Sequence, residues 1–186
     1  MNGARRVLLA TGLASAGVFL TFGAAADAAS AAKLDASGRE TLQKLVGVST
    51  KAARYNGMAK AVLVFPRIIK AGFMVGAQTG DGVLLEKGKP IAYYNISAGS
   101  FGMQVGGQAF SYVLFFMNQK ALSYLQSSNG WAIGSGPSVV VVDKGKAMSN
   151  TSTTVTQDVY AFPFGNKGLM AGLGLEGSKI TPIHPK

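Results

Sequence analysis

The spacing of apolar residues near the start of this chain has a helical period and then changes to a period of two. The first apolar set falls on one face at about 100° per residue; it consists of Leu42, Leu45, Val46, Ala52 and Ala53. Three basic residues, Lys44, Lys51 and Arg54, gather on the opposite side. The pattern therefore predicts an amphipathic helix over residues 38–54.

The start of this helix is indicated by Ser37 and Glu40, which have the spacing of a capping box. In that motif the serine side chain accepts a hydrogen bond from the first turn, and the glutamate reaches back to the serine N–H. Residues 29–36, directly before the motif, are expected to form a short tether.

From Ala59 onward, apolar residues alternate with small or polar ones, which is typical of β-strands. Ala59–Phe65 and Tyr112–Met117 are apolar runs, and we interpret the second as core rather than as a membrane-inserting segment. Further expected strands lie around Phe73–Ala77, Phe101–Val105, Val139–Val142, Val155–Phe162 and Leu169–Leu175.

Two turn signals and one further helix complete the pattern. Asp81-Gly82 and Gly88-Lys89-Pro90 have the composition of turns. Residues Asn118–Ser127 carry Ala121, Leu122 and Leu125 at helical offsets. The chain is thus expected to form a single β-rich α+β domain, with an N-terminal helix and one further helix.

Glycines recur on one face of several expected strands. They are Gly72, Gly76 and Gly80 in one strand, Gly102 and Gly106 in another, and Gly172 and Gly174 in the last. Interior strand glycines mark bulges, tight curvature or close backbone approach. We therefore expect a strongly coiled antiparallel sheet or a small barrel. A covering N-terminal helix is favoured over a ligand groove on the glycine face.

The N-terminus has the order of a secretory signal. Arg5 and Arg6 precede an uncharged run, and small residues follow it. Cleavage is expected before Ala29, with a cut before Asp27 as the second interpretation and an uncleaved anchor helix as the alternative. The expected organisation is a signal peptide over 1–28, the tether over 29–36 and one domain over 37–186. Residues 1–28 do not show whether export uses the general secretory route or the twin-arginine route.

Composition excludes most catalytic chemistry. The chain has no cysteine and one histidine, His184, near its end. Thiolate catalysis and multi-histidine metal centres are thereby excluded, and we expect no catalytic residue, cofactor, metal or small-molecule substrate. A hydrolase built on paired carboxylates is a third class that sequence spacing does not test. Asp158 is interpreted as a residue that fixes a loop or ladder by hydrogen bonds.

The charge balance indicates a polyanionic partner. The chain has eighteen Lys and Arg and eight Asp and Glu, which gives a net charge of +10. Such a charge favours a membrane surface or nucleic acid as the partner. The lysines are scattered and the chain carries an export signal, so nucleic acid is the less favoured partner.

Three segments resemble the SYLF lipid-binding domain family: AKAVLVFPRIIKAGF (59–73), SFGMQVGGQAF (100–110) and DVYAFPFGNKGLMAGLGLEGSKI (158–180). The resemblance covers residues 37–183, and the C-terminal block is its most specific part. The chain departs from the family near Tyr93, where it reads IAYYNIS and members often carry a tryptophan.

This resemblance implies a non-enzymatic domain that binds phospholipids; phosphoinositides and actin are partners of the eukaryotic members. Family lipid contacts would map to the 38–54 helix and to Lys60, Arg67 and Lys70. Trp131 is either a core residue or an interfacial membrane anchor.

Together with the export signal, the resemblance predicts a periplasmic or secreted protein that binds anionic phospholipid at an envelope membrane. The alternative is a structural or partner-binding envelope protein whose basic face meets another protein or an acidic polymer. The lipid headgroup, the membrane and the oligomeric state stay open.

Overall fold

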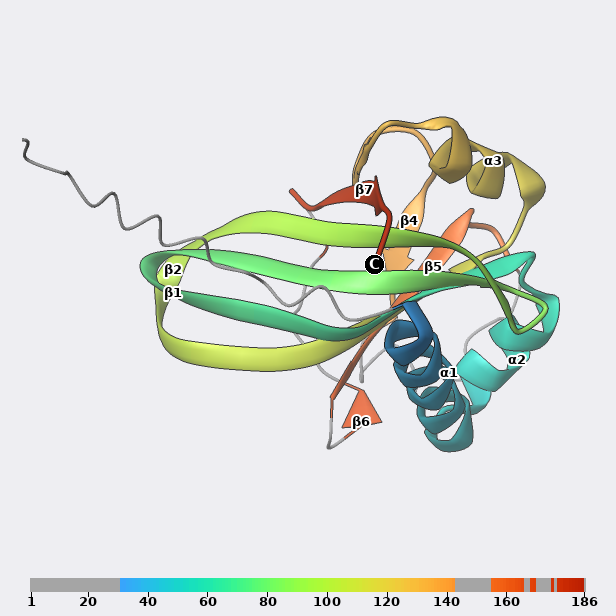
Figure 1. Ribbon diagram of the computed structural model, residues 1–186, viewed down its shortest axis with the longest axis horizontal. Coiled ribbons are helices and arrows are strands. Elements are labelled where there is room, and N and C mark those ends of the chain that lie inside the picture. The colour runs from blue at the N-terminus through green and yellow to red at the C-terminus, as the bar shows by residue number, and fades with distance from the viewer. Residues whose placement is uncertain (1–30, 143–154, 166–167, 170–174, 176, 186) are drawn as a thin grey trace, which may run out of the picture.

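The computed structural model describes residues 31–142, 155–165, 168–169, 175 and 177–185 (Figure 1). The expected signal peptide lies outside these residues. The described elements, in chain order, are α1 (Ala31–Val48), α2 (Thr50–Met58), β1 (Ala61–Glu86), β2 (Lys89–Phe116), α3 (Gln119–Ser127), β3 (Trp131–Ala132), β4 (Val139–Val141), β5 (Val159–Gly165), β6 (Gly168–Leu169) and β7 (Lys179–Ile183).

The expected N-terminal helix is two helices. Residues 31–36, expected as a tether, form the first turns of α1, so Ser37 is not the helix cap. The break comes at Ser49, whose backbone is extended and whose Oγ accepts a hydrogen bond from the Ala52 N–H at 3.2 Å. Because Ser49 caps α2, the basic residues on either side of it do not share one continuous helix face.

Strands β1 and β2 form one long antiparallel ribbon. Their pairing runs from Glu86 opposite Lys89 to Ala61 opposite Phe116, around a turn in which Lys87 and Gly88 have positive φ. The turn signal at Gly88 is confirmed. The one at Asp81-Gly82 is wrong, because both residues lie inside β1.

The ribbon folds back on itself at a register shift between Gly72 and Met74. As a result, the second half of β1 approaches the first half very closely. A Cβ on Gly82 would lie 2.5 Å from the Phe65 ring and 2.7 Å from the Val64 carbonyl oxygen. Gly80, from the expected glycine face, is equally close to β1 itself: a Cβ there would lie 2.5 Å from the Arg67 carbonyl oxygen. The first half of β1, and not the N-terminal helix, therefore makes the closest approach to Gly80, which also lines a groove beside α1. Gly172 and Gly174 lie outside the described residues.

The described strands form one seven-stranded sheet. The order along the main path is β3-β7-β2-β5-β4, with β1 also pairing with β2 and β6 with β5. β7 pairs with residues 93–97 of β2, and β5 pairs with residues 111–116. All pairs are antiparallel except β4 with β5. The expected fold class, a β-rich α+β domain with a strongly coiled sheet, is confirmed.

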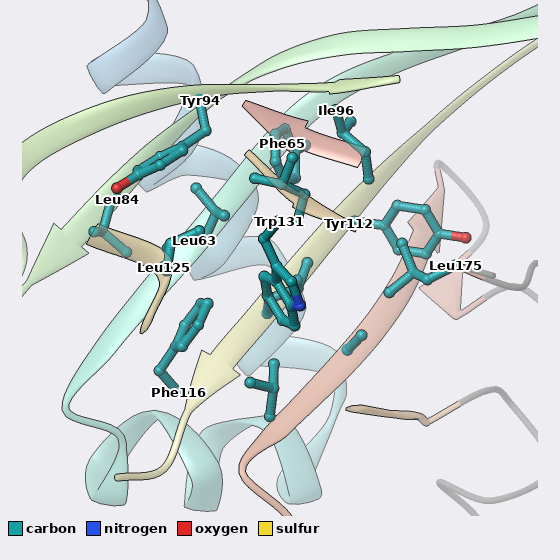
Figure 2. Packing of buried hydrophobic residues seen from close by; sticks show 14 of the residues in the cluster. Leu63, Phe65, Leu84, Tyr94, Ile96, Tyr112, Phe116, Leu125, Trp131 and Leu175 are labelled. Atoms are coloured by element: carbon teal, nitrogen blue, oxygen red, sulfur yellow. The ribbon is translucent and has the colours of Figure 1, made fainter. Parts of the chain in front are cut away.

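Each face of the sheet has its own core. One face packs against α3 and holds Trp131, Tyr112 and Phe116 (Figure 2). The other face packs against α1 and α2, and there Tyr55 stacks on Tyr160 with ring centroids 4.3 Å apart. Residues 112–116 are buried in these two cores, which confirms their interpretation as core.

Candidate functional site: a groove between α1 and β1

A groove of about 620 Å³ lies between α1 and the two halves of β1. We call it the α1–β1 groove. Its lining residues are Lys33, Leu34, Ser37, Glu40, Thr41, Lys44, Pro66, Arg67, Ile69, Thr79, Gly80, Asp81 and Asn95. Three of them are basic, two are acidic and most of the others are polar or small.

Helix α1 contributes a polar stripe to one wall of the groove. Lys33, Ser37, Thr41 and Lys44 are spaced three or four residues apart, so they lie on one side of the helix. Leu34, Gly38 and Leu45 are the buried residues of α1. Burial of these three holds α1 against the sheet and leaves both lysines at the groove.

Strand β1 contributes Arg67 because its ladder is interrupted at Pro66. Proline has no backbone N–H to donate, and in sheets it is found at edges or bulges. The register shifts between Phe65 and Ile68, and the Ser111 Oγ donates a hydrogen bond to the Pro66 carbonyl oxygen at 2.7 Å. This irregularity places Arg67 beside Ile69, an exposed large apolar side chain, on the groove wall.

The second half of β1 and the facing part of β2 form a polar floor. The Asn95 side chain donates to the Asp81 Oδ1 at 2.8 Å and to the Thr79 Oγ1 at 3.1 Å. Asn95 and Asp81 are direct partners in the strand register. The carboxylate of Asp81 is thus held by a cross-strand partner on a face of the sheet, where a turn had been expected.

Charge in the groove is mixed. Lys44 Nζ lies 2.6 Å from Glu40 Oε1, one helical turn away, and both side chains are largely exposed. The hydrogen bond and positive charge of Lys44 lower the pKa of Glu40. Three bases and two acids give the lining a net charge of +1. The groove therefore offers cations to a phosphate without being strongly electropositive itself.

The structure brings together only part of the predicted lipid-binding set. Lys44 and Arg67 share the groove. Lys51 and Arg54 lie on α2, beyond the break at Ser49. The remaining two, Lys60 directly before β1 and Lys70 within it, are not among the lining residues.

Lys33 is the site residue that sequence reasoning missed. Its segment was interpreted as a tether, which has no defined face. The signal was present, because Lys33, Ser37, Thr41 and Lys44 have helical spacing. This spacing would have extended the predicted helix back to Lys33, the second lysine of the groove.

Trp131 is a core residue, and its alternative role as a membrane anchor is wrong for this structure. Its side chain is 1% exposed. The indole Nε1–H donates to the Ser135 carbonyl oxygen at 2.7 Å, and the ring centroid lies 6.0 Å from that of Phe116. Figure 2 shows it in the middle of the cluster. An indole held in this way has no face left for lipid.

Among the described residues, histidine, aspartate and glutamate side chains do not gather in any group of three able to hold a metal ion. In the same part of the chain, no helix is both long and apolar enough to cross a membrane.

Comparison with known proteins gives one family. The family described as Las17-binding protein actin regulator (Ysc84) matches residues 97–184. The match begins inside β2 and ends after β7, so it includes β5 and α3 but neither α1 nor β1. No curated protein matches the chain.

Proposed function

Because residues 97–184 match the Ysc84, or SYLF, domain family, we propose that this chain is a non-enzymatic, exported protein that binds anionic phospholipid. The description of the matched family names an actin regulator that binds Las17, and the SYLF resemblance described above implies phospholipid binding. An exported protein does not meet actin, so phospholipid binding is the property we propose for this chain. Binding would be peripheral, at an envelope membrane.

The observation that carries this proposal is the α1–β1 groove. It combines Lys33, Lys44 and Arg67 with the exposed side chain of Ile69. Lysine and arginine bind phosphate oxygens, arginine often through two parallel hydrogen bonds. An adjacent exposed apolar side chain suits the region where headgroups meet acyl chains. The groove therefore matches the chemistry of a phospholipid surface.

Two contributions to binding are expected, one from the whole chain and one from the groove. Without Arg5, Arg6 and Asp27, the protein that begins at Ala29 has a net charge of +9, which attracts it to an anionic surface over a Debye length of about 10 Å at 0.1 M salt. Each basic side chain near such a surface contributes about 1 kcal/mol. Lys44 is paired with Glu40 and the net charge of the groove lining is +1, so the groove itself contributes about 1 kcal/mol, roughly a fivefold gain in partitioning.

Co-sedimentation with vesicles tests the proposal, using three variants of equal charge. The groove variant is Lys33→Glu/Lys44→Glu/Arg67→Glu, and the α2-side variant is Lys51→Glu/Arg54→Glu/Lys60→Glu. The control is Lys87→Glu/Lys120→Glu/Lys179→Glu, which reverses three exposed lysines outside the groove. We expect the groove variant to lose the most binding, and wild-type binding to weaken between about 0.05 and 0.5 M salt.

Two outcomes would contradict the proposal at different levels. Equal loss in all three variants would show that binding follows net charge alone and that the groove has no special role. Equal pelleting of the wild type with neutral and anionic vesicles would contradict a preference for anionic lipid. A protein partner would then become the better explanation of the basic surface.

Export is supported by the order of residues at the N-terminus, where Arg5 and Arg6 precede an uncharged run that ends in small residues. We expect the mature protein to begin at Ala29. N-terminal sequencing of protein recovered from the cell envelope measures this directly. A chain that still begins at Met1 there would indicate an anchor helix instead of a cleaved signal.

A further inference from the structure

The bent end of the β1–β2 ribbon contains no charged residue. We define the ribbon end as residues 71–77 of β1 and 99–107 of β2, which contain no Asp, Glu, Lys or Arg. On β2 this uncharged stretch extends from Pro90 to Gln119. Residues 94, 96 and 110–116 of this stretch are buried, and burial explains their lack of charge. It does not explain the lack of charge at the exposed ribbon end.

The ribbon end projects away from the helices. Figure 1 shows β1 and β2 extending together beyond α1, α2 and α3 before they turn back. Its exposed residues include Ala71, Gly72, Ala77, Gly99 and Gly107. The ribbon end is therefore accessible, although it lacks the charges that normally cover accessible strands.

Apolar residue types are concentrated in this segment. They are Phe73, Met74 and Val75 in β1, and Phe101, Met103 and Val105 in β2. Val75 and Phe101 are partners in the strand register. In the sequence, small residues surround these apolar ones.

The uncharged end begins where the groove cations stop. Ile69 and Arg67 line the α1–β1 groove, and Lys70 directly precedes Ala71, the first residue of the ribbon end. A membrane presents negatively charged phosphates first and apolar acyl chains beneath them. Positive charge followed by an uncharged apolar segment is complementary to that order. This charge complementarity identifies the occupant as a phospholipid surface.

We propose that the ribbon end inserts into the membrane at the boundary of headgroups and acyl chains while the α1–β1 groove holds the headgroups. This inference rests on the proposed function and adds the element that enters the lipid. Among the described strands, β1 pairs only with β2. The backbone N–H and C=O groups on the other edge of β1 therefore have no strand partner there and would enter the membrane with it. Such groups are costly in hydrocarbon, and insertion is therefore shallow.

A label at the ribbon end measures this insertion. The chain has no cysteine, so Ala71→Cys can be labelled uniquely with an environment-sensitive fluorophore. The control is Gln126→Cys, at an exposed position on α3. With anionic vesicles, we expect a blue shift and quenching by acyl-brominated lipid at position 71, and neither at position 126.

A lysine at the same position separates insertion from simple attraction. Ala71→Lys adds a positive charge, so it would strengthen binding if the ribbon end only lay near an anionic surface. If the ribbon end inserts, the same charge must enter the acyl boundary, and binding weakens by about tenfold. The control Gln126→Lys adds the same charge on α3 and should not weaken binding.

The outcomes distinguish this inference from the proposed function. Vesicle binding without quenching at position 71, or stronger binding by Ala71→Lys, overturns the inference and leaves the proposed function intact. Absence of vesicle binding by the wild type overturns both. A blue shift at position 71 without vesicles, together with dimers in sedimentation, would identify the ribbon end as an interface between two copies and overturn insertion.

Discussion

At the scale of single residues, Asp158 is the most connected acidic side chain of the described structure. Its Oδ1 accepts from the Asn118 Nδ2 at 2.7 Å, and its Oδ2 accepts from both the N–H and the Oγ–H of Ser138 at 2.9 Å. Asn118 in turn caps α3 through the Ala121 N–H. One carboxylate thus joins the start of α3, the segment before β4 and the start of β5.

Replacing this carboxylate should produce a pH-dependent loss of stability. The hydrogen bonds of Ser138 and Asn118 lower the pKa of Asp158, so its stabilisation is present above the unfolded pKa of about 3.9 and is lost as pH falls through the lowered folded pKa. We expect Asp158→Asn to reduce the free energy of unfolding by about 1.5–3 kcal/mol at pH 7. The deficit should shrink toward pH 3.

Urea unfolding of Asp158→Asn and wild type at pH 7 and pH 3 measures this difference. Glu86→Gln, at an exposed position beside the hairpin turn, is the control and should be near neutral. A deficit for Asp158→Asn that is equal at both pH values would show that the charge of the carboxylate is irrelevant.

Individual residues could be predicted where their chemistry is local. Asp158 was expected to fix a loop, and it does. Trp131 could not be assigned to core or surface, because its burial depends on contacts with Phe116 and Ser135 that no local pattern encodes. Lys33 was missed for the opposite reason: its helical spacing was present, but the segment was interpreted as a tether.

At the scale of elements, α1 contains two glycines in opposite environments. A Cβ on Gly38 would collide with the Cγ1 of Val83, a fully buried and β-branched side chain of β1. A Cβ on Gly47 would meet nothing within 4 Å. Gly38 is therefore required for the approach of helix to sheet, whereas Gly47 only weakens the end of its helix.

Alanine substitutions at these two glycines should have effects of opposite sign. Gly38→Ala overpacks the contact with Val83 and should cost about 1–3 kcal/mol. Gly47→Ala removes backbone freedom from an exposed helical position and should add up to about 1 kcal/mol. Thermal unfolding of the two variants beside wild type measures both shifts. A Gly38→Ala protein as stable as wild type would show that α1 can move away from β1 without cost.

Elements were predictable where one period persists, and their boundaries were not. The alternation around Phe73–Ala77 and Phe101–Val105 correctly indicated strands. Asp81-Gly82 has turn chemistry, but pairing of Asp81 with Asn95, far along the chain, overrides that preference. The break at Ser49 was missed because apolar spacing continues across it.

At the scale of the whole molecule, the two long strands explain why one sheet can have two separate cores. The same strands contribute alternately to both faces: Leu63 and Leu114 to one core, Val64 and Val113 to the other. The coiled fold class was predictable from the glycines and the period of two. The groove was not, because it forms only when β1 turns back and brings Thr79 and Asp81 beside Arg67.

The C-terminal strands β5 and β7 both pair with β2, and this arrangement has a consequence for folding. Pairing of β1 with β2 can propagate residue by residue from the turn at Lys87 and Gly88, so each step closes only a small additional loop, at little entropic cost. The ribbon can therefore form before the chain beyond it is in place. Until then the second edge of β2, uncharged from Pro90 to Gln119, is open to pairing with other chains. β5 and β7 cover that edge at residues 111–116 and 93–97, and the C-terminal strands thereby protect the folding chain from aggregation.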